Sequence, residues 1–375
     1  MNFLSAKTAS PKLVSSVLRN GQRAIGCLVL WMGFAAALWG QAANAEKRGG
    51  AERKIKVLPI PALGYSPETK TYFGAIGLFN IDWYQDSITR KSNAKVEFNY
   101  TLNQQLVLEQ EWNYFSKAER WFTDGLIHTS EYPDFYYGVG ANTSAQSELL
   151  FASIRSVVRL GLYRNMGRQV FLGGGIRYVN FEGVTPETLG LFQEVKDGNN
   201  VGIRAAVFQD SRNNLLNPTK GHYYLVELEQ NFSRRNYFIF KLDLRKYHQF
   251  QSGFVFSNRI YNSFVTNRPN FYDYSMIGGD RLVRGYLLGR YRNNHVSTVQ
   301  TELRTPMRWK MGLAFIGGIS SVYDDWNTFY AVAHPNYGLG LRVLMDQKDN
   351  VNFRVDYVLG DGSNSGLYIS FGESF

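Results

Sequence analysis

The chain has 375 residues with a formal net charge of +10, and 15% of its residues are aromatic. It holds a single cysteine, which excludes a disulfide framework and a thiolate metal site. A modest positive charge spread along the sequence gives no indication of a nucleic-acid-binding protein.

Residues 1–45 have the composition of a secretory signal peptide. Four basic residues precede an apolar run over residues 24–39, and Ala43-Asn44-Ala45 provides a small-residue cleavage site. A membrane anchor is the alternative, but the run is shorter than the ~20 apolar residues that a spanning helix needs. Cleavage would remove 45 of the 375 residues, Cys27 among them, and leave an exported chain of 330. Residues 46–56 then form a short periplasmic segment, too small for a domain of its own.

Residues 57–375 form a series of segments in which apolar and polar side chains alternate. In residues 93–103 the even-numbered positions are apolar and the odd-numbered positions are polar, and residues 350–357 show the same alternation with odd positions apolar. Successive side chains of a β-strand point to opposite faces, so each segment predicts a strand with one apolar and one polar face.

Two architectures fit this alternation, a soluble sandwich and a membrane barrel. The signal peptide, the strand length and the aromatic content favour the barrel, which leaves no open strand edge in hydrocarbon. Charged residues in mid-strand, such as Arg245 and Arg354, must then face the lumen, because Arg or Lys exposed to lipid near the midplane would cost ~2–4 kcal/mol. We therefore predict an all-β fold, a transmembrane antiparallel β-barrel.

The predicted strands number about sixteen, an even number that is typical of single-chain bacterial barrels. The first pair and the fifth are the least regular, so fourteen is the alternative. The long connections 130–149, 182–198 and 266–293 are expected to be extracellular, and short turns such as Asn103-Gln104 and Gln251-Ser252-Gly253 periplasmic. The segments are 57–65, 70–83, 92–103, 105–115, 120–129, 150–163, 169–181, 199–210, 220–232, 236–249, 254–265, 294–305, 311–323, 336–345, 349–358 and 365–375.

The last predicted strand, residues 365–375, ends on Phe375. A terminal aromatic strand is a signal that the assembly machinery of outer membranes reads. Phe375 is therefore a candidate recognition residue.

Residues 278–294 pack four arginines and four glycines into seventeen positions between two predicted strands. Glycine allows tight backbone turns, and each arginine needs carboxylates or carbonyl groups opposite its planar fork of donors. A solvated hairpin tip would rarely need both so densely. We expect this loop to fold inward and to find its partners inside the barrel.

Three motifs resemble the bacterial surface antigen superfamily of outer-membrane assembly and translocation barrels, of the BamA and TamA type. The first is Val283-Arg284-Gly285-Tyr286, which precedes the twelfth predicted strand as in that family. The second is Asp210-Ser211-Arg212-Asn213-Asn214, followed by Asn217-Pro218-Thr219-Lys220-Gly221 in a hairpin. The third is Glu302-Leu303-Arg304-Thr305-Pro306. The resemblance implies a sixteen-strand barrel whose hairpin residues Asp210, Arg212, Asn214, Pro218 and Gly221 belong to a family motif.

The resemblance also implies that Arg284 reaches into the lumen and pairs with Glu302 on strand twelve. On strand thirteen the family usually has an aspartate, whereas this chain has Gly317-Gly318. A charge pair that lacks one partner leaves a costly unpaired charge, so we expect a more loosely held loop. Family members that assemble or secrete proteins also carry periplasmic domains, and the sequence predicts a single-domain form without them.

No catalytic or metal-binding pattern stands out. The five histidines are scattered without ligand spacing, and neither a nucleophile elbow nor a phosphate-binding loop occurs. We expect neither a metal nor another cofactor, and no enzyme activity; a lumen-rim hydrolase is the alternative that spacing alone does not exclude.

Two functions remain open from the sequence. The barrel would assist the insertion or translocation of a protein or lipid partner, with a periplasmic protein or protein cargo and with outer-membrane lipid and lipopolysaccharide around it. Alternatively, it is an outer-membrane channel or structural barrel that has lost the assembly role. The arginine loop favours the first, and the glycines on strand thirteen favour the second. Either would operate in the outer membrane of a Gram-negative-type bacterium.

Overall fold

The computed structural model describes residues 54–66, 70–101, 106–186, 192–347 and 350–375. The predicted signal peptide and the turn Asn103-Gln104 lie outside these ranges. Ile55–Phe375 forms one compact unit. No helix in the described ranges is long and apolar enough to cross a bilayer.

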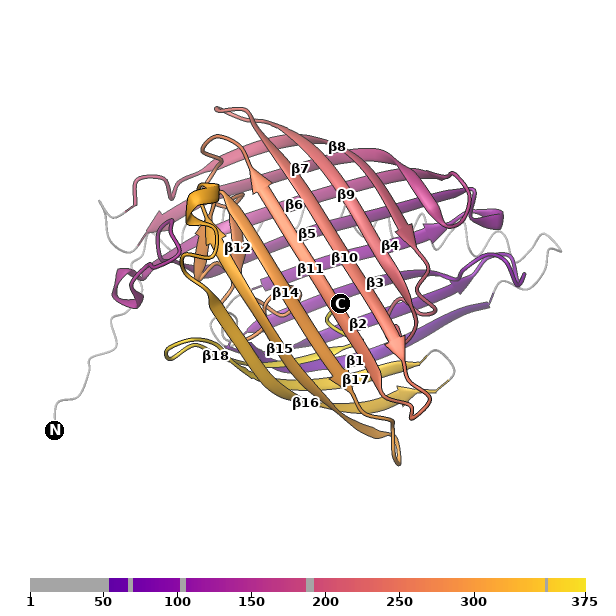
Figure 1. Cartoon of the computed structure of the whole chain (residues 1–375). Coiled ribbons are helices and arrows are strands. Elements are labelled where there is room, and N and C mark those ends of the chain that lie inside the picture. The colour runs from indigo at the N-terminus through magenta and orange to yellow at the C-terminus, as the bar shows by residue number, and fades with distance from the viewer. Residues whose placement is uncertain (1–53, 67–69, 102–105, 187–191, 348–349) are drawn as a thin grey trace. The chain divides into compact units, whose positions relative to one another are not determined.

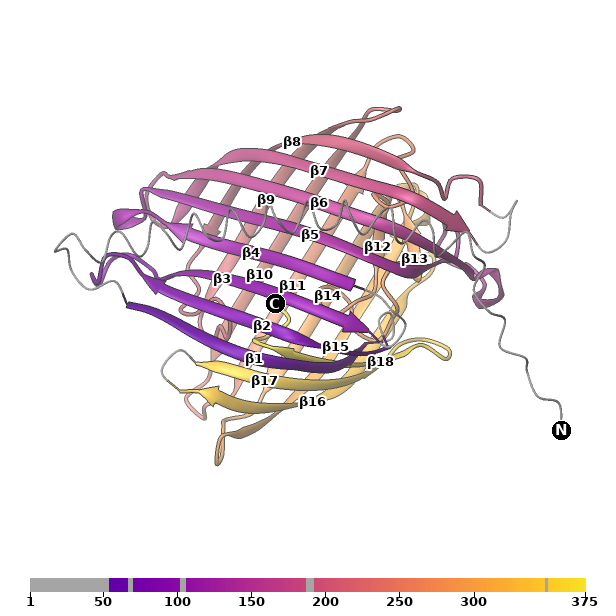
Figure 2. The ribbon, with the colours of Figure 1, turned by 180° about the vertical axis from the view of Figure 1, so that it is seen from behind.

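Within the described ranges, sixteen strands form one sheet in which each strand pairs with its neighbours in chain order. The strands curl around a lumen, and β1 and the yellow C-terminal strands lie on the same side of the barrel (Figures 1 and 2). The sheet contains β1 (Lys54–Ser66), β2 (Lys70–Asp82), β3 (Ser92–Thr101), β4 (Leu106–Phe115), β5 (Trp121–Tyr136), β6 (Leu149–Asn165), β7 (Val170–Pro186), β8 (Gly198–Asp210), β9 (Gly221–Phe232), β10 (Tyr237–Gln249), β11 (Val255–Val265), β14 (His295–Arg304), β15 (Met311–Tyr323), β16 (His334–Asp346), β17 (Val351–Leu359) and β18 (Ser365–Phe371).

The predicted barrel of about sixteen strands is therefore confirmed, and the differences concern strand ends. β5 and β7 continue to Tyr136 and Pro186, so the connections after them are shorter than predicted. The last strand ends at Phe371 rather than at Phe375. Three short 3-10 helices lie in connections, at Lys117–Glu119, Ala145–Ser147 and Trp326–Thr328.

Because side chains alternate between the two faces of each strand, the charged residues of these strands lie on the inner face of the barrel. On β17, Arg354 and Asp356 are buried, whereas the apolar Tyr357 between two inward positions is 54% exposed. On β16 the apolar Leu339 is 60% exposed while Arg342 is buried. A soluble sandwich would bury the apolar residues instead, so this pattern belongs to a barrel with lipid outside and polar groups within.

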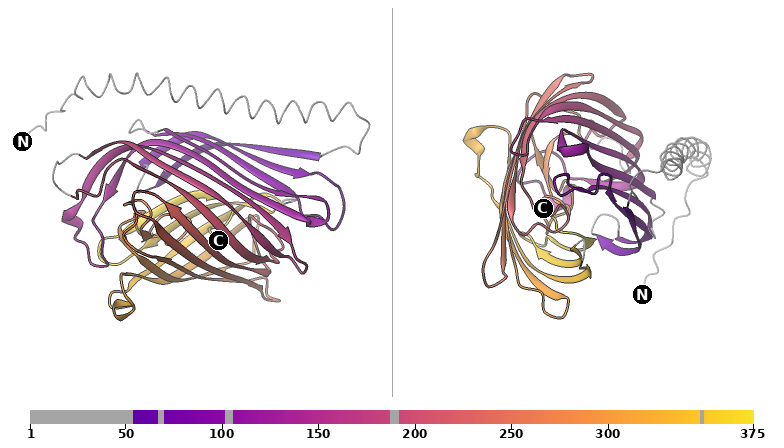
Figure 3. Two further views of the ribbon diagram at one scale, coloured as in Figure 1. Left: turned by 90° about the horizontal axis from the view of Figure 1, so that it is seen from above. Right: turned by 90° about the vertical axis from the view of Figure 1, so that its right-hand side faces the viewer.

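Connections alternate between the two ends of the barrel because neighbouring strands are antiparallel (Figure 3). The connections that follow β3, β5, β7 and β11 share one end, and those that follow β8 and β10 share the other. The sequence prediction that grouped the turn after β3 with Gln251-Ser252-Gly253 is therefore wrong, although Asn103 and Gln104 themselves lie outside the described residues.

The connection between β11 and β14 folds into the lumen and contains a second, two-stranded sheet of β12 (Ser275–Ile277) and β13 (Tyr291–Asn293). The sequence did not predict these strands. They hold a small apolar core against the wall, made of Ile277, Val283, Tyr286, Tyr291, Val296 and Val322. We call residues 266–294 the lumen loop.

The hairpin between β8 and β9 provides a test of close packing at Gly221. Its φ is +100°, and a Cβ there would lie 2.2 Å from the carbonyl oxygen of Ser211. Gly167 is a matched control, because its φ is +101° but a Cβ there would have no atom within 4 Å. We expect G167A to cost about 1–2 kcal/mol for backbone strain, and G221A to cost more because the Ser211 backbone must also move. Urea unfolding midpoints of the refolded barrel measure both, and equal losses would contradict the close contact.

Candidate functional site

The motif Val283-Arg284-Gly285-Tyr286 turns against the inner wall near β16, β17 and β18. The φ of Gly285 is +99°, and its N–H donates to Tyr368 Oη at 3.0 Å. Tyr286 is fully buried, donates its hydroxyl to the carbonyl of Pro335 and accepts from the N–H of Asp361 at 2.9 Å. Glycine is required here because a side chain in this left-handed conformation would be strained and would press on the backbone of residues 359–360.

Arg284 lies between two carboxylates on different strands. Its Nη2 donates to Glu302 of β14 at 2.7 Å, and its Nη1 donates to Asp356 of β17. The side chain is only 3% exposed. The structure thus brings Arg284 and Glu302 together and adds a carboxylate that the sequence analysis had not assigned to this residue.

Arg284 belongs to a larger network, which we call the latch. Arg342 donates to Glu373 at 2.8 Å, to Glu302 at 3.2 Å and to Asp356. The latch comprises four arginines and four carboxylates, namely Arg284, Arg304, Arg342, Arg354, Asp280, Glu302, Asp356 and Glu373. Their formal charges cancel.

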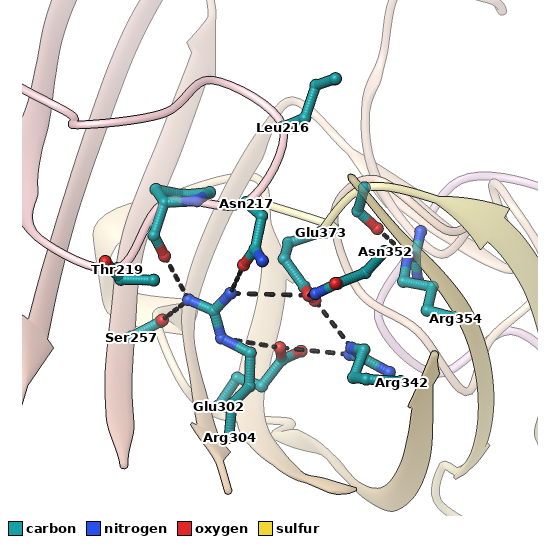
Figure 4. A network of polar contacts seen from close by, with 12 residues as sticks. Leu216, Asn217, Thr219, Ser257, Glu302, Arg304, Arg342, Asn352, Arg354 and Glu373 are labelled. Atoms are coloured by element: carbon teal, nitrogen blue, oxygen red, sulfur yellow. Dashed lines mark hydrogen bonds and ion pairs between the residues drawn. The ribbon is translucent and has the colours of Figure 1, made fainter. Parts of the chain in front are cut away.

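Two further arginines extend the latch in opposite directions. Arg354 donates to Asp356 at 2.7 Å and to Asp280, which belongs to the lumen loop. Arg304 lies 3.5 Å from Glu373 and 3.7 Å from Glu302, between the wall and the β8–β9 hairpin (Figure 4). Each guanidinium therefore shares its carboxylates with another, which offsets the cost of burying so many charges.

The β8–β9 hairpin is shaped by the motif residues that the sequence analysis singled out. Arg212 donates from Nε and Nη2 to the two oxygens of Asp210, at 2.9 and 3.0 Å. Asn214 Oδ1 accepts from the backbone N–H groups of Leu216 and Asn217, both at 2.8 Å. These local bonds fix the turn and aim its tip at the lumen.

The tip of this hairpin reaches strands that are not its neighbours. Arg304 of β14 donates to Asn217 Oδ1 and to the carbonyl of Pro218 (Figure 4). The side chain of Asn217 also donates to Asn350, at 3.1 Å, in the connection between β16 and β17. Pro218 therefore serves through its carbonyl group, and the hairpin is joined to the latch through Arg304.

Residues 372–375 connect the β8–β9 hairpin to the lumen loop. The N–H of Glu373 donates to the carbonyl of Leu216 in the hairpin at 2.7 Å, and Ser374 Oγ donates to the carbonyl of Asp280 in the lumen loop at 2.7 Å. Phe375 is 7% exposed rather than part of a lipid-facing strand. Its proposed role in recognition remains a prediction, while its place in the last strand is corrected because the chain leaves the sheet at Phe371.

Two more arginines, one in the wall and one in the loop, hold the lumen loop against other parts of the wall. Arg177 of β7 donates from Nη1 and Nη2 to the two carboxylate oxygens of Asp273, at 2.9 and 2.7 Å. Arg281 pairs with Glu109 of β4 at 2.9 Å and with Glu111 at 2.5 Å. The loop is thus tied to β4, β7, β14 and β17, strands far apart in the sheet order, and it spans the lumen.

Comparison with known proteins identifies the family. A sequence profile described as the Omp85 superfamily domain matches residues 79–345. The chain belongs to the Omp85 superfamily. Members of this superfamily are outer-membrane proteins of Gram-negative bacteria that serve assembly or translocation, which places the present barrel in that membrane. A search of curated proteins gave no match.

Solved structures of similar fold include two barrels. One is BamA from Haemophilus ducreyi lacking POTRA domains 1–3, with a TM-score of 0.54, 12% identity, and coverage of 85% of this chain and 70% of that one. The other is CdiB from Acinetobacter baumannii, with a TM-score of 0.58, 11% identity, and coverage of 85% and 65%. The chain therefore spans about two thirds of the length of either structure, and the likeness establishes the fold.

β15 is the thirteenth strand of the barrel sheet, and in this Omp85 chain glycines stand there in place of the aspartate that the family resemblance predicted. A Cβ at Gly318 would lie 2.3 Å from the amide nitrogen of Gln300, so the glycine makes room for that buried side chain. Asp356, two strands further on, supplies the charge instead. The expectation of a loosely held loop is therefore wrong. Alternation had placed Asp356 on the polar face of its strand, but nothing in the sequence indicated that it faces Arg284.

The latch predicts strong coupling between Arg284 and Glu302. We expect R284Q and E302Q each to lower the free energy of unfolding, and the double variant to be no worse than either, with a coupling of about 0.5–3 kcal/mol. Arg159 and Asp124 form the control pair, because they lie 3.7 Å apart and Arg159 is 39% exposed. Their coupling should stay near 0–1 kcal/mol. Urea unfolding of the refolded barrel measures both cycles, and additive losses at Arg284 and Glu302 would refute the pairing.

The ion pair between Arg177 and Asp273 predicts that the stability of the barrel depends on pH. Burial acts to raise the pKa of Asp273, but the ion pair and hydrogen bonds with Arg177, together with the Tyr237 hydroxyl, lower it below its ordinary value. Such a group stabilises the fold above the ordinary aspartate pKa of about 3.9 and loses this contribution as the pH falls through the folded value. The stability difference between the native barrel and D273N should therefore shrink below about pH 4. Unfolding midpoints between pH 7 and 3 test this, and a difference that grows on acidification would contradict it.

Proposed function

We propose that this Omp85 barrel assists the insertion or translocation of a protein or lipid partner at the outer membrane, through a lumen loop that is released from its latch. The observation that carries the proposal is the latch itself. A barrel used only as a scaffold has no need to hold a loop across its lumen with buried charges, since well-packed apolar residues would be as stable. The proposal involves no catalytic step.

We infer that the network limits the loop to two states, held and released. The loop and residues 372–375 supply charges to the latch and the β8–β9 hairpin supplies acceptors to Arg304, so moving any one of them breaks buried ion pairs or hydrogen bonds. Partial displacement is costly, and release is favoured only when a partner supplies new contacts for several charges together. Cargo or a periplasmic partner protein that carries its own charged groups could supply them.

The edges of the sheet provide the second element of this proposal. β1 and β18 stand at the two ends of the strand order, with 13 and 7 residues respectively. A seven-residue strand can hydrogen-bond only part of the edge of a thirteen-residue strand, whatever the register. The seam between them can include no more residue pairs than the seven that join β17 to β18, and it is the place where a strand of a partner could be added.

The second candidate function is an outer-membrane channel. It is favoured by a cavity of about 900 Å³ lined by charged side chains of strands from β3 to β17, of the β8–β9 hairpin and of the lumen loop. In this alternative the lumen loop restricts a solute pathway and the surrounding lipid and lipopolysaccharide are passive.

Depletion of the protein followed by quantitative proteomics of the outer membrane separates the two. We expect a fall in other barrels, broad for general assembly or limited to one or two proteins for a dedicated translocator. The wild-type gene and a variant with the exposed turn residue changed, R234Q, should restore these levels, whereas R284Q should not. If all other barrels keep their levels on depletion, the assembly proposal is refuted and solute uptake becomes the function to measure.

A further inference from the structure

The lumen carries a second cluster of arginines whose charges are not balanced. It lies around Tyr223, near the start of β9, and lines the cavity of about 900 Å³. The guanidinium carbons of Arg212 and Arg245 lie 4.8 and 5.1 Å from the centre of the Tyr223 ring. The two side chains thus share one aromatic ring, although like charges repel each other at this separation.

The carboxylates beside these arginines are already occupied. Asp243 accepts from Arg245, at 3.0 and 2.6 Å, and also from Arg259, at 3.0 and 2.8 Å. Asp210 accepts from Arg212 and lies 3.3 Å from Arg90. Including Glu119, which pairs with Arg90 at 2.9 Å, four arginines meet three carboxylates. One positive charge is left over, in contrast to the latch, where charges cancel.

Each of the two arginines keeps one free donor. Both use Nε and Nη2 for their aspartate, and within the described residues their Nη1 atoms have no hydrogen-bond partner and are not sealed from solvent. The free Nη1 donors therefore belong to two guanidinium groups that lie against one aromatic ring and line one cavity.

The lining of the cavity as a whole also carries a surplus of positive charge. Its lining contains twelve Lys or Arg residues and eight Asp or Glu residues, a surplus of four positive charges. A low-dielectric wall with a surplus of one sign raises the local concentration of counter-ions. An anion that enters the cavity would be drawn to the place where donors are free.

We propose that Arg212 and Arg245 form a binding site for a phosphate group at the hairpin end of the lumen. A guanidinium group that keeps both N–H groups of its Nη1 free after binding a carboxylate can still donate to an oxyanion, and two such groups around one ring match its several oxygens. Asp210 and Asp243 are positioning residues, because they fix the orientation of the forks. The phosphate group belongs either to a free anion or to a lipid headgroup, and the test below distinguishes these sources.

The inference goes beyond the proposed function and does not depend on it. The latch and this site are built from different arginines, and a phosphate site would serve an assembly barrel or a channel equally. Its failure would leave the proteomic test of assembly untouched.

Isothermal titration of the full refolded barrel in zwitterionic detergent tests the site with two probes, inorganic phosphate and dihexanoyl phosphatidic acid, at constant ionic strength. We expect saturable binding of at least one probe with one site per barrel. Binding of inorganic phosphate identifies a free anion as sufficient, and binding of phosphatidic acid alone identifies a lipid headgroup. Absence of saturable binding of both probes would overturn the proposal.

Variants locate the site. R212Q and R245Q should each weaken binding about tenfold or more, because a hydrogen bond to a charged group is lost. R159Q is the matched control, since Arg159 lines the same cavity and carries the same charge but belongs to a different ion pair. It should bind as the native barrel does, and equal weakening in R159Q would show a diffuse field and overturn the site.

A conservative change covers the case in which a glutamine variant fails to fold. R245K keeps the positive charge but lacks the planar fork, so it should also weaken binding. A difference in electrophoretic mobility between unheated and heated samples confirms that the variant barrels are folded. Unchanged affinity in folded R245K would overturn the proposed geometry.

Discussion

Charges buried in the wall of a barrel must be matched by charges inside it, and this constraint organises the lumen of the protein. Lipid surrounds the outer faces of the strands, so mid-strand charges such as Asp243, Arg354 and Asp356 turn inward. The latch satisfies the constraint with four arginines and four carboxylates drawn from the lumen loop, β14, β16, β17 and residue 373. Because every latch charge except Asp280 serves more than one partner, few members can leave without a cost to the others.

This sharing joins three segments that are far apart in the chain. The lumen loop contributes Arg284 and Asp280, the β8–β9 hairpin contributes Asn217 and Pro218, and the final residues contribute Glu373. Arg304 and Arg342 lie between them. The interior is consequently one connected polar network rather than a set of separate plugs.

The two arginine clusters of the lumen differ in their charge balance, and that difference gives them different roles. The latch is neutral and its guanidinium groups are all paired with carboxylates, so it holds structure, although Asp280, Arg354 and Glu373 also line the cavity. The cluster around Tyr223 retains an unpaired positive charge and free donors at an accessible cavity, so it is suited to a ligand. Both clusters use the same residue type, and only the count of neighbouring carboxylates separates them.

The sequence by itself determined the architecture. Strict alternation over residues 93–103 and 350–357 follows from a lipid-facing and a water-facing side, and this period-two signal is local, so it survives without knowledge of the fold. Residues 278–294 could be singled out for the same reason, since dense glycine and arginine in a connection is a local property, whereas residues 210–221 were singled out by their resemblance to a family motif. The tertiary structure alone decided which charges meet. Asp356 and Glu373 complete the latch because the curvature of the sheet and the inward turn after Phe371 bring them to Arg284 and Arg342, and such pairings across a lumen leave no periodic trace in the chain.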